Sequence, residues 1–167
     1  MKFHDIKRFP NIYYHVDVPL VYLETTINRY LSEYHLDFNP DFQRDYVWSK
    51  EQKISYTEYV LKNPTSGLEI YFNHPGWMTS FTGTMTLVDG KQRLDAILSF
   101  IHNEIPAFNI LCKDYEGTLP FICLSFNIAR LQTRKEVLKW YLDFNTGGTY
   151  HTNEEIQKVK ELIEKEK

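Results

Sequence analysis

The sequence predicts one α+β domain with a small mixed sheet and about five helices. Apolar residues recur at helical spacing in several segments, and short β-branched or alternating runs separate those segments. The length of 167 residues suits one domain with a buried core. No repeat, low-complexity tract or Gly/Ser linker interrupts the chain, so residues 1–167 are expected to form a single unit.

Five segments have the apolar spacing or the capping residues that are typical of helices. Ser49 and Gln52 form the pattern of a capping box, which begins a helix. The clearest periodicity follows Gly90, where Leu94, Ile97, Leu98 and Ile101 share one helical face. The expected helices are residues 20–34, about 50–63, about 91–102, 133–144, and a last one capped by Thr152 or Asn153.

Four short runs are typical of strands, being β-branched or rich in alternating apolar residues. They are residues 68–72, 84–88, 107–112 and 121–126. Residues 37–48 suit no regular element, and residues 73–83 contain Pro75 and two glycines, which favours a loop.

Charge and cysteine content limit the classes of partner. The chain has 19 Lys and Arg against 22 Asp and Glu, a net charge of −3, which argues against a broad surface for duplex DNA. A small anionic ligand needs only a few arginines and a helix start. No apolar run is long enough to span a membrane, and Cys112 and Cys123 have no metal-ligand spacing. We therefore expect a cytoplasmic protein with no membrane partner, and two buried cysteines within strands.

The strongest local signal is the predicted strand-turn-helix at Asp89-Gly90-Lys91-Gln92-Arg93. Gly90 permits a sharp turn, and the first N–H groups of the following helix form an anion site together with the helix dipole. Arg93 supplies a planar group for bidentate phosphate contact, and Lys91 a point charge. Gln92 can orient a water or bond a phosphate oxygen. The alternative is that Asp89 simply caps an ordinary helix.

Three segments in order carry a resemblance to a known family. They are Phe42-Gln43-Arg44-Asp45-Tyr46-Val47-Trp48, then Asp89-Gly90-Lys91-Gln92-Arg93-Leu94, then Phe144-Asn145-Thr146-Gly147-Gly148-Thr149 leading to Glu155. The chain resembles the GmrSD N-terminal domain family, within the ParB/sulfiredoxin-like group. Several motifs in the right order are a stronger signal than any one of them.

The resemblance implies that the three segments converge on one nucleotide pocket. It implies catalytic roles for Asp89, Gln92 and Arg93, and a metal-bound water held by Asp89, with Mg²⁺ as the cofactor. The nucleotide-binding residues it implies are Gln43, Arg44, Gly90, Lys91, Asn145, Gly147 and Gly148. Of these, Arg44 is expected to be a second phosphate clamp, and Gln43 and Asn145 its polar neighbours.

Departures from the family pattern are few. Lys91-Gln92 stands where members often have Gln-Gln, and Asp45 where they have Pro. Full-length restriction proteins of the family add a nuclease domain with a His-Asn-His-like centre, and this sequence ends about twenty residues after Gly148. We therefore expect no DNA cleavage by that route.

Other patterns favour structural roles. Pro40-Asp41 with Glu51-Gln52-Lys53 imitates a metal-nuclease motif, but Glu51 begins an expected helix rather than lying on a strand. No cysteine stands beside the phosphate turn, so sulfiredoxin chemistry is not expected. Tryptophans 48, 77 and 140 can stack a base but suit core or rim packing better. Arg130, Arg134, Lys135 and Lys139 suit a solvated helix face better than a nucleic-acid surface.

Three functions remain open from the sequence. The first is a metal-dependent nucleoside triphosphatase, with Arg93 and Arg44 neutralising phosphoryl charge. The second is a non-catalytic module that binds a nucleotide and acts through a protein partner. The third is a DNA-binding or weak ParB-like nuclease domain, against which the net negative charge argues.

Overall fold

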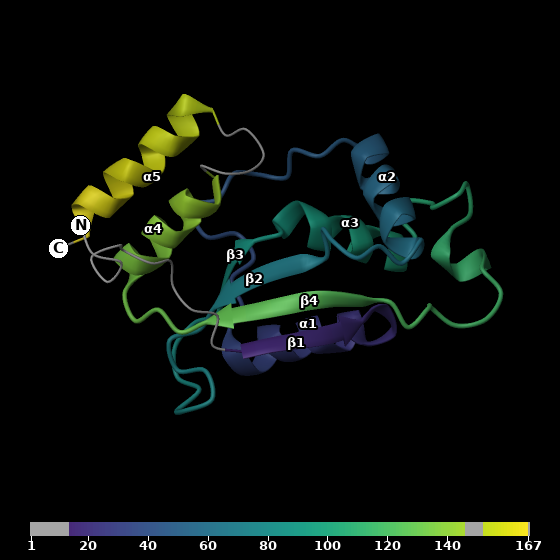
Figure 1. Ribbon diagram of the computed structural model, residues 1–167, viewed down its shortest axis with the longest axis horizontal. Helices are drawn as coiled ribbons and strands as arrows, with labels where there is room; N and C mark the ends of the chain where they lie inside the picture. The colour runs from purple at the N-terminus through teal and green to yellow at the C-terminus, as the bar shows by residue number, and fades with distance from the viewer. Residues whose placement is uncertain (1–13, 146–151, 167) are drawn as a thin grey trace.

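A four-stranded mixed sheet forms the centre of the molecule (Figure 1). The computed structural model describes residues 14–145 and 152–166, with the side chain of Asn145 left out. The strands are β1 (Tyr14–Pro19), β2 (Glu69–Asn73), β3 (Thr86–Asp89) and β4 (Cys123–Ala129), in the order β1-β4-β2-β3. Strand β4 is antiparallel to β1 and parallel to β2, and β2 is antiparallel to β3. The mixed character of the sheet is therefore confirmed.

Five α-helices accompany this sheet in the described residues. They are α1 (Leu20–Tyr34), α2 (Lys50–Leu61), α3 (Lys91–Ile101), α4 (Arg134–Asn145) and α5 (Asn153–Lys165). Capping boxes begin α2 at Ser49 and α5 at Thr152. The α+β class and the helix count are confirmed, while the relation to ParB and sulfiredoxin folds stays a prediction. None of these helices has the length and apolar composition needed to cross a membrane.

The larger core lies between the sheet and α1, with α3 contributing its apolar face. Tyr30 of α1 is 2 % exposed, and its ring meets Phe72 of β2 and Phe126 of β4 at centroid distances of 5.8 and 6.0 Å. Trp77 and Trp140 are also buried, so their expected packing role is confirmed. Burying this apolar surface is the main force that fixes α1 on the sheet.

A second core joins α4 and α5 to the β3 end of the sheet. Phe42 packs there on Tyr141 of α4, with ring centroids 5.0 Å apart, and Val159 of α5 is buried. Figure 1 shows α4 and α5 at one end of the molecule and α2 and α3 at the other, with the segment before α2 running between them. That segment contains the Phe42–Trp48 motif.

Two expectations about strands were wrong. Residues 107–112 form a turn instead, closed by a bridge between Ala107 and Ile110, because Phe108 and Asn109 have positive φ angles of 50° and 64°. A 3-10 helix follows at Cys112–Asp114. Strand β1 was not predicted at all, although it pairs with β4 along its whole length.

The two cysteines also differ from expectation. Cys112 lies in the 3-10 helix rather than in a strand, and Cys123 begins β4. Both are half-buried free thiols rather than fully buried residues.

Arg134, the first residue of α4, is engaged in ion pairs. Its guanidinium donates to both oxygens of Asp41 at 2.7 and 2.8 Å, and it also pairs with Glu166 at 2.9 Å. Arg134 and Lys139 are exposed, whereas Arg130 and Lys135 are half-buried, so the expected solvated face is only partly observed.

Candidate functional site

The chain turns from β3 into α3 at Gly90, which has φ 98° and ψ 9°. Two features of the structure disfavour a side chain at this position. The conformation is left-handed, and a Cβ atom would lie 2.7 Å from Ile70 Cδ1 and 3.3 Å from the Glu69 carbonyl oxygen. The turn therefore needs glycine, and it delivers the start of α3 close to β2.

Asp89 does not cap α3, which corrects one of the two expectations for this residue. Gly90 is the N-cap, and no side chain among the described residues bonds the first turn. The Asp89 carboxylate instead accepts a hydrogen bond from Arg93 Nη2 at 2.5 Å, one helical turn away. The N–H groups of the first turn are thus left without intrahelical partners, as at any helix start.

Arg93 has more donors than the described residues satisfy. A guanidinium carries five N–H donors, and Asp89 receives one from Nη2. The Nε atom is buried, and no described residue accepts its hydrogen. Buried polar atoms without a partner are rare in proteins and call for an explanation, such as a missing ligand.

Two tyrosines, Tyr56 and Tyr71, lie within electrostatic reach of Arg93. Burial raises the pKa of Tyr56, and the positive charge of Arg93 partly opposes that rise. Burial also raises the pKa of Tyr71, with Glu69 and Asp89 adding to the rise and Arg93 again opposing it. Both hydroxyls therefore stay protonated at neutral pH, and that of Tyr56 donates to the Gly67 carbonyl oxygen at 2.7 Å.

Arg44 joins the same region through Tyr141. Burial raises the pKa of Tyr141 to about 12, while the charge of Arg44 lowers it and the charges of Glu155 and Asp89 raise it. One α4 side chain is thus within electrostatic reach of the first motif, the second motif and the start of α5. The structure brings the Phe42–Trp48 segment and the Asp89–Arg93 turn into contact, while a shared site of Arg44, Asp89 and Arg93 stays a prediction.

Gln92 holds the Phe42–Trp48 segment by its backbone. Its Oε1 atom accepts hydrogen bonds from the Val47 and Trp48 amides at 3.1 and 3.2 Å. Its Nε2 atom donates to the Asp45 carbonyl oxygen at 3.0 Å. The side chain is 9 % exposed, so these bonds lie where water competes little.

Lys91 and Gln43 complete the attachment. Lys91 Nζ donates to the Arg44 carbonyl oxygen at 3.0 Å and lies 4.4 Å from the Tyr46 ring centroid. Burial lowers the pKa of Lys91. Gln43 Nε2 donates to the Leu87 carbonyl oxygen of β3. We call these three side chains, Gln43, Lys91 and Gln92, the brace, because they fasten the two motifs to each other.

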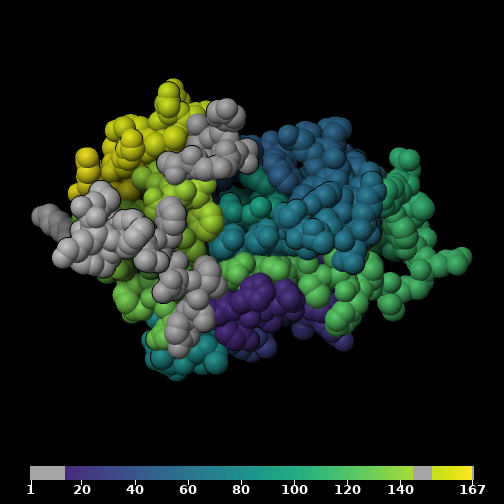
Figure 2. All heavy atoms as spheres, viewed as in Figure 1, coloured from purple at the N-terminus to yellow at the C-terminus, as the bar shows by residue number. Residues whose placement is uncertain are grey.

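The hydrogen bonds of the brace change the roles expected of Lys91 and Gln92. Lys91 and Gln92 were expected to face phosphates, yet their polar atoms contact the backbone of residues 44–48. Asp89, Arg93 and Arg44 are left as the charged groups of the site. Figure 2 shows the surface hollowed between the lime atoms of the α4 region and the blue atoms of the α2 region, with teal atoms at its floor. Teal is the colour of the β3–α3 turn.

Comparison with protein families decides the relationship. Residues 23–167 match the family described as GmrSD restriction endonuclease, N-terminal domain. The chain belongs to this family. The membership relates it to a restriction, and thus a phage-defence, protein. Comparison with curated proteins and with solved structures found no match.

The third motif of this GmrSD N-terminal domain is only partly described. Asn145 ends α4, which places its backbone at the end of the helix that carries Tyr141. Its side chain, and Gly147 and Gly148, lie outside the described residues.

Metal ligands are sparse at this site. Within residues 14–145 and 152–166, no three His, Cys, Asp or Glu side chains gather in a way that could hold a metal ion. Asp89 gives one carboxylate oxygen to Arg93. The described donors therefore do not form a resident metal site, although Mg²⁺ commonly needs only one or two carboxylates when it arrives with substrate phosphates.

Sequence reasoning missed the tyrosines. Tyr56, Tyr71 and Tyr141 received no role in the sequence analysis. They lie on α2, β2 and α4, which are far apart in the sequence, so no local spacing reveals their common neighbourhood. A tyrosine at core spacing has the same pattern whether or not its hydroxyl faces a site.

Proposed function

We propose that the hollow at the β3–α3 turn binds the phosphates of a nucleoside triphosphate. The observation that carries this proposal is the buried Arg93 Nε atom, which has no acceptor among the described residues. The Arg93 side chain is 25 % exposed, and a phosphate oxygen would supply that acceptor once the guanidinium turns toward the hollow. Arg binds phosphate in a bidentate way through adjacent donors. The uncapped start of α3 adds backbone N–H groups and a favourable dipole.

Arg44 supplies the second cation in this proposal. Its backbone position depends on the brace, because Lys91 bonds its carbonyl oxygen and Gln92 bonds the backbone of Asp45, Val47 and Trp48. Lys91 and Gln92 therefore act as positioning residues. Gln43 has the same role, through β3. Holding a cation rigidly reduces the entropy lost when a phosphate binds.

The reaction that this arrangement favours is hydrolysis of the terminal phosphoanhydride. Water attacks the γ-phosphorus, the bond to the bridging oxygen breaks, and the products are a nucleoside diphosphate and inorganic phosphate. Arg93 and Arg44 neutralise the charge that develops on the transferred group. Asp89 orients Arg93 through Oδ2. Mg²⁺ would enter with the nucleotide, shielding phosphate charge, with Asp89 as one oxygen ligand.

A second candidate is a nucleotide sensor without turnover, and one observation favours it. Both polar atoms of the Gln92 amide bond backbone groups, so this side chain is not free to position an attacking water. Such a module would bind the same phosphates and pass the signal to a protein partner in restriction or phage defence. DNA binding is the third candidate, and the net charge of −3 argues against it.

The experiment that tests the proposal measures binding and turnover on the same samples. Calorimetric titration with each of the four nucleoside triphosphates and Mg²⁺ gives affinity, and phosphate release gives turnover. We expect Arg93→Ala to weaken binding at least tenfold, since an ionic hydrogen bond is worth about 1.5–3 kcal/mol. Arg29→Ala is the matched control, because the Arg29 side chain on α1 is 55 % exposed and pairs only weakly with Glu33 at 3.9 Å.

Each outcome selects one candidate. Turnover that Arg93→Ala abolishes supports the hydrolase. Binding without turnover supports the sensor. If wild type binds no nucleotide, the phosphate site is wrong, and binding to duplex DNA that weakens steeply with salt would support the third candidate.

A further inference from the structure

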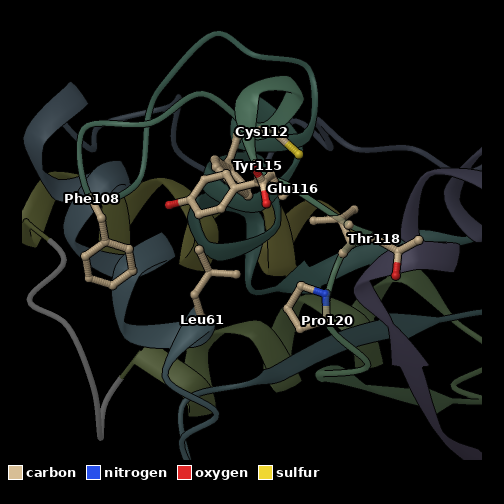
Figure 3. A pocket seen from close by; sticks show the side chains of 10 residues that line it. Leu61, Phe108, Cys112, Tyr115, Glu116, Thr118 and Pro120 are labelled. Carbon is tan, nitrogen blue, oxygen red and sulfur yellow. The ribbon is translucent and has the colours of Figure 1, made fainter.

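A second cavity lies away from the candidate nucleotide site, where α2 and α3 end (Figure 3). Its volume is about 250 Å³. Leu61 of α2 and Phe100 of α3 form one side, and residues 108–120 form the other. Figure 3 shows the side chains of Leu61, Phe108, Tyr115 and Pro120 gathered around the opening. A volume of this size suits one large side chain.

The segment that closes this cavity is held rigidly although it belongs to no sheet. The Phe108 amide donates to Glu58 Oε1 of α2 at 2.7 Å. The Lys113 amide donates to Asn103 Oδ1 at 2.7 Å, and the Tyr115 hydroxyl donates to the Ala107 carbonyl oxygen at 2.7 Å. Phe100 and Ala107 are buried beneath it. The cavity is therefore formed before any ligand arrives.

Exposed apolar side chains surround the opening. Phe108 is 43 % exposed and Tyr115 37 %, both in the lining. Ile110 and Phe121 lie just outside it in the chain and are 41 % and 74 % exposed. Apolar residues scattered singly on a surface need no explanation, but several around one pocket are typical of a protein interaction site.

The charge at the opening is negative. Glu116 is the one charged residue in the lining, and it is exposed. Glu58 lies close enough to raise the pKa of Tyr115, after the larger effect of burial. The Lys62 ammonium packs 5.6 Å from the Phe108 ring centroid, which shows that a cation is accommodated beside these rings. A basic group on an incoming ligand would complement this rim.

We propose that the cavity docks a bulky apolar side chain, flanked by lysine or arginine, on a partner protein. A protein fits better than a small molecule because Ile110 and Phe121 lie outside the cavity and would stay uncovered by a small ligand. Helix α3, with 11 residues, separates the cavity from the Gly90 turn by about 16 Å of helix. The cavity is therefore distinct from the candidate nucleotide site.

The test uses synthetic peptides and the full chain. Acetyl-Leu-Lys-Phe-Lys-Leu-amide is titrated against the ¹⁵N-labelled protein, with chemical-shift changes as the readout. We expect changes confined to residues around Phe108, Tyr115 and Glu116. The peptide with Ala in place of Phe should bind roughly tenfold more weakly, since it lacks the buried ring. The peptide with Glu in place of both Lys should bind about threefold more weakly, as expected for an exposed charge pair.

Glu116→Lys provides the matched variant, because Glu116 is the one charged lining residue and is exposed, so its replacement reverses the charge at the rim. This variant should prefer the Glu-flanked peptide.

The proposal is overturned if the peptides change the chemical shifts of other regions, or if the Lys and Glu peptides bind with equal affinity. It is also overturned if phenethylamine, which carries a ring and an ammonium group, binds as tightly as the Lys peptide, because a small-molecule site would then explain the cavity. Arg93→Ala serves as the control that separates this site from the nucleotide site, and it should not change peptide affinity.

Discussion

The two ends of α3 are built in different ways. At its start, the brace ties residues 43–48 to the helix and to β3 by side-chain hydrogen bonds to backbone groups. At its end, apolar side chains surround a cavity and several remain exposed. The first end uses its polar residues to hold charged groups in place, whereas the second presents unpaired apolar surface. A region that fixes arginines suits an anion, and a region that exposes rings suits a protein.

Removing the brace should have the largest effect at the first end. Gln92→Leu leaves the Asp45 carbonyl and the Val47 and Trp48 amides without partners. We expect the free energy of unfolding to fall by about 3 kcal/mol, since three part-buried hydrogen bonds are lost and each contributes about 0.5–1.5 kcal/mol. Urea denaturation measures this loss. Gln157→Leu is the control, because Gln157 is exposed and bonds only Glu161 at 3.3 Å. Equal losses in both variants would contradict the bracing role.

The crowded turn at Gly90 should have the next largest effect. Gly90→Ala meets both a left-handed backbone and a contact of 2.7 Å with Ile70 Cδ1. Gly117→Ala meets a similar φ of 90° with nothing within 4 Å of its Cβ, so the pair isolates the effect of crowding. We expect Gly90→Ala to destabilise by about 2–3 kcal/mol and Gly117→Ala by about 1 kcal/mol. Thermal unfolding of the two variants measures the difference. Identical melting temperatures would show that the Ile70 side chain moves aside without a cost in stability.

His74 is the opposite case to Gln92, because both of its buried ring nitrogens lack a partner among the described residues. Burial lowers the pKa of His74, so the folded state resists protonation. As pH falls below the ordinary value near 6.5, the unfolded chain gains a proton that the folded chain does not, and stability is lost. We expect a loss of about 1 kcal/mol between pH 7.5 and 5.5. Urea denaturation across this range measures it.

Replacing His74 isolates its contribution to the pH dependence of stability. His74→Phe should flatten the pH dependence, while His35→Asn, at an exposed position with φ 52°, should leave it unchanged. A His74→Phe protein that loses as much stability as wild type on acidification would rule out this source.

The smallest effect should come from the exposed end of α3. Phe121 is 74 % exposed, so Phe121→Ser should change the free energy of unfolding by less than about 0.5 kcal/mol. Nucleotide affinity should not change. A large destabilisation in urea would mean that Phe121 supports the fold rather than an interface.

The sequence predicted the parts of the fold that depend on local pattern. Helices α1 and α3 follow from apolar periodicity, and the starts of α2 and α5 from the capping residues Ser49 and Thr152. The run at residues 107–112 is apolar enough for a strand but turns at Phe108 and Asn109, where the chain closes over Phe100. Strand β1 owes its existence to pairing with β4, a distant partner that local pattern does not reveal.

The sequence predicted that the first two motifs meet, but not how their side chains are arranged. The motifs that contain Arg44, Asp89 and Arg93 do converge. Motif reasoning assigned ligand contacts to Lys91 and Gln92 because amides and ammonium groups bind phosphate well. It had no means of knowing that the irregular segment 43–48 would need those donors and acceptors for its own backbone.

The most direct test of the phosphate site observes the Arg93 Nε–H group itself. Its ¹H–¹⁵N signal, assigned by its loss in Arg93→Lys, is followed during titration with nucleoside triphosphate and Mg²⁺. We expect this signal to move with saturation and to exchange more slowly with water, because a phosphate oxygen becomes its acceptor. A signal that stays in place while the nucleotide binds elsewhere, or while no nucleotide binds, would contradict the site.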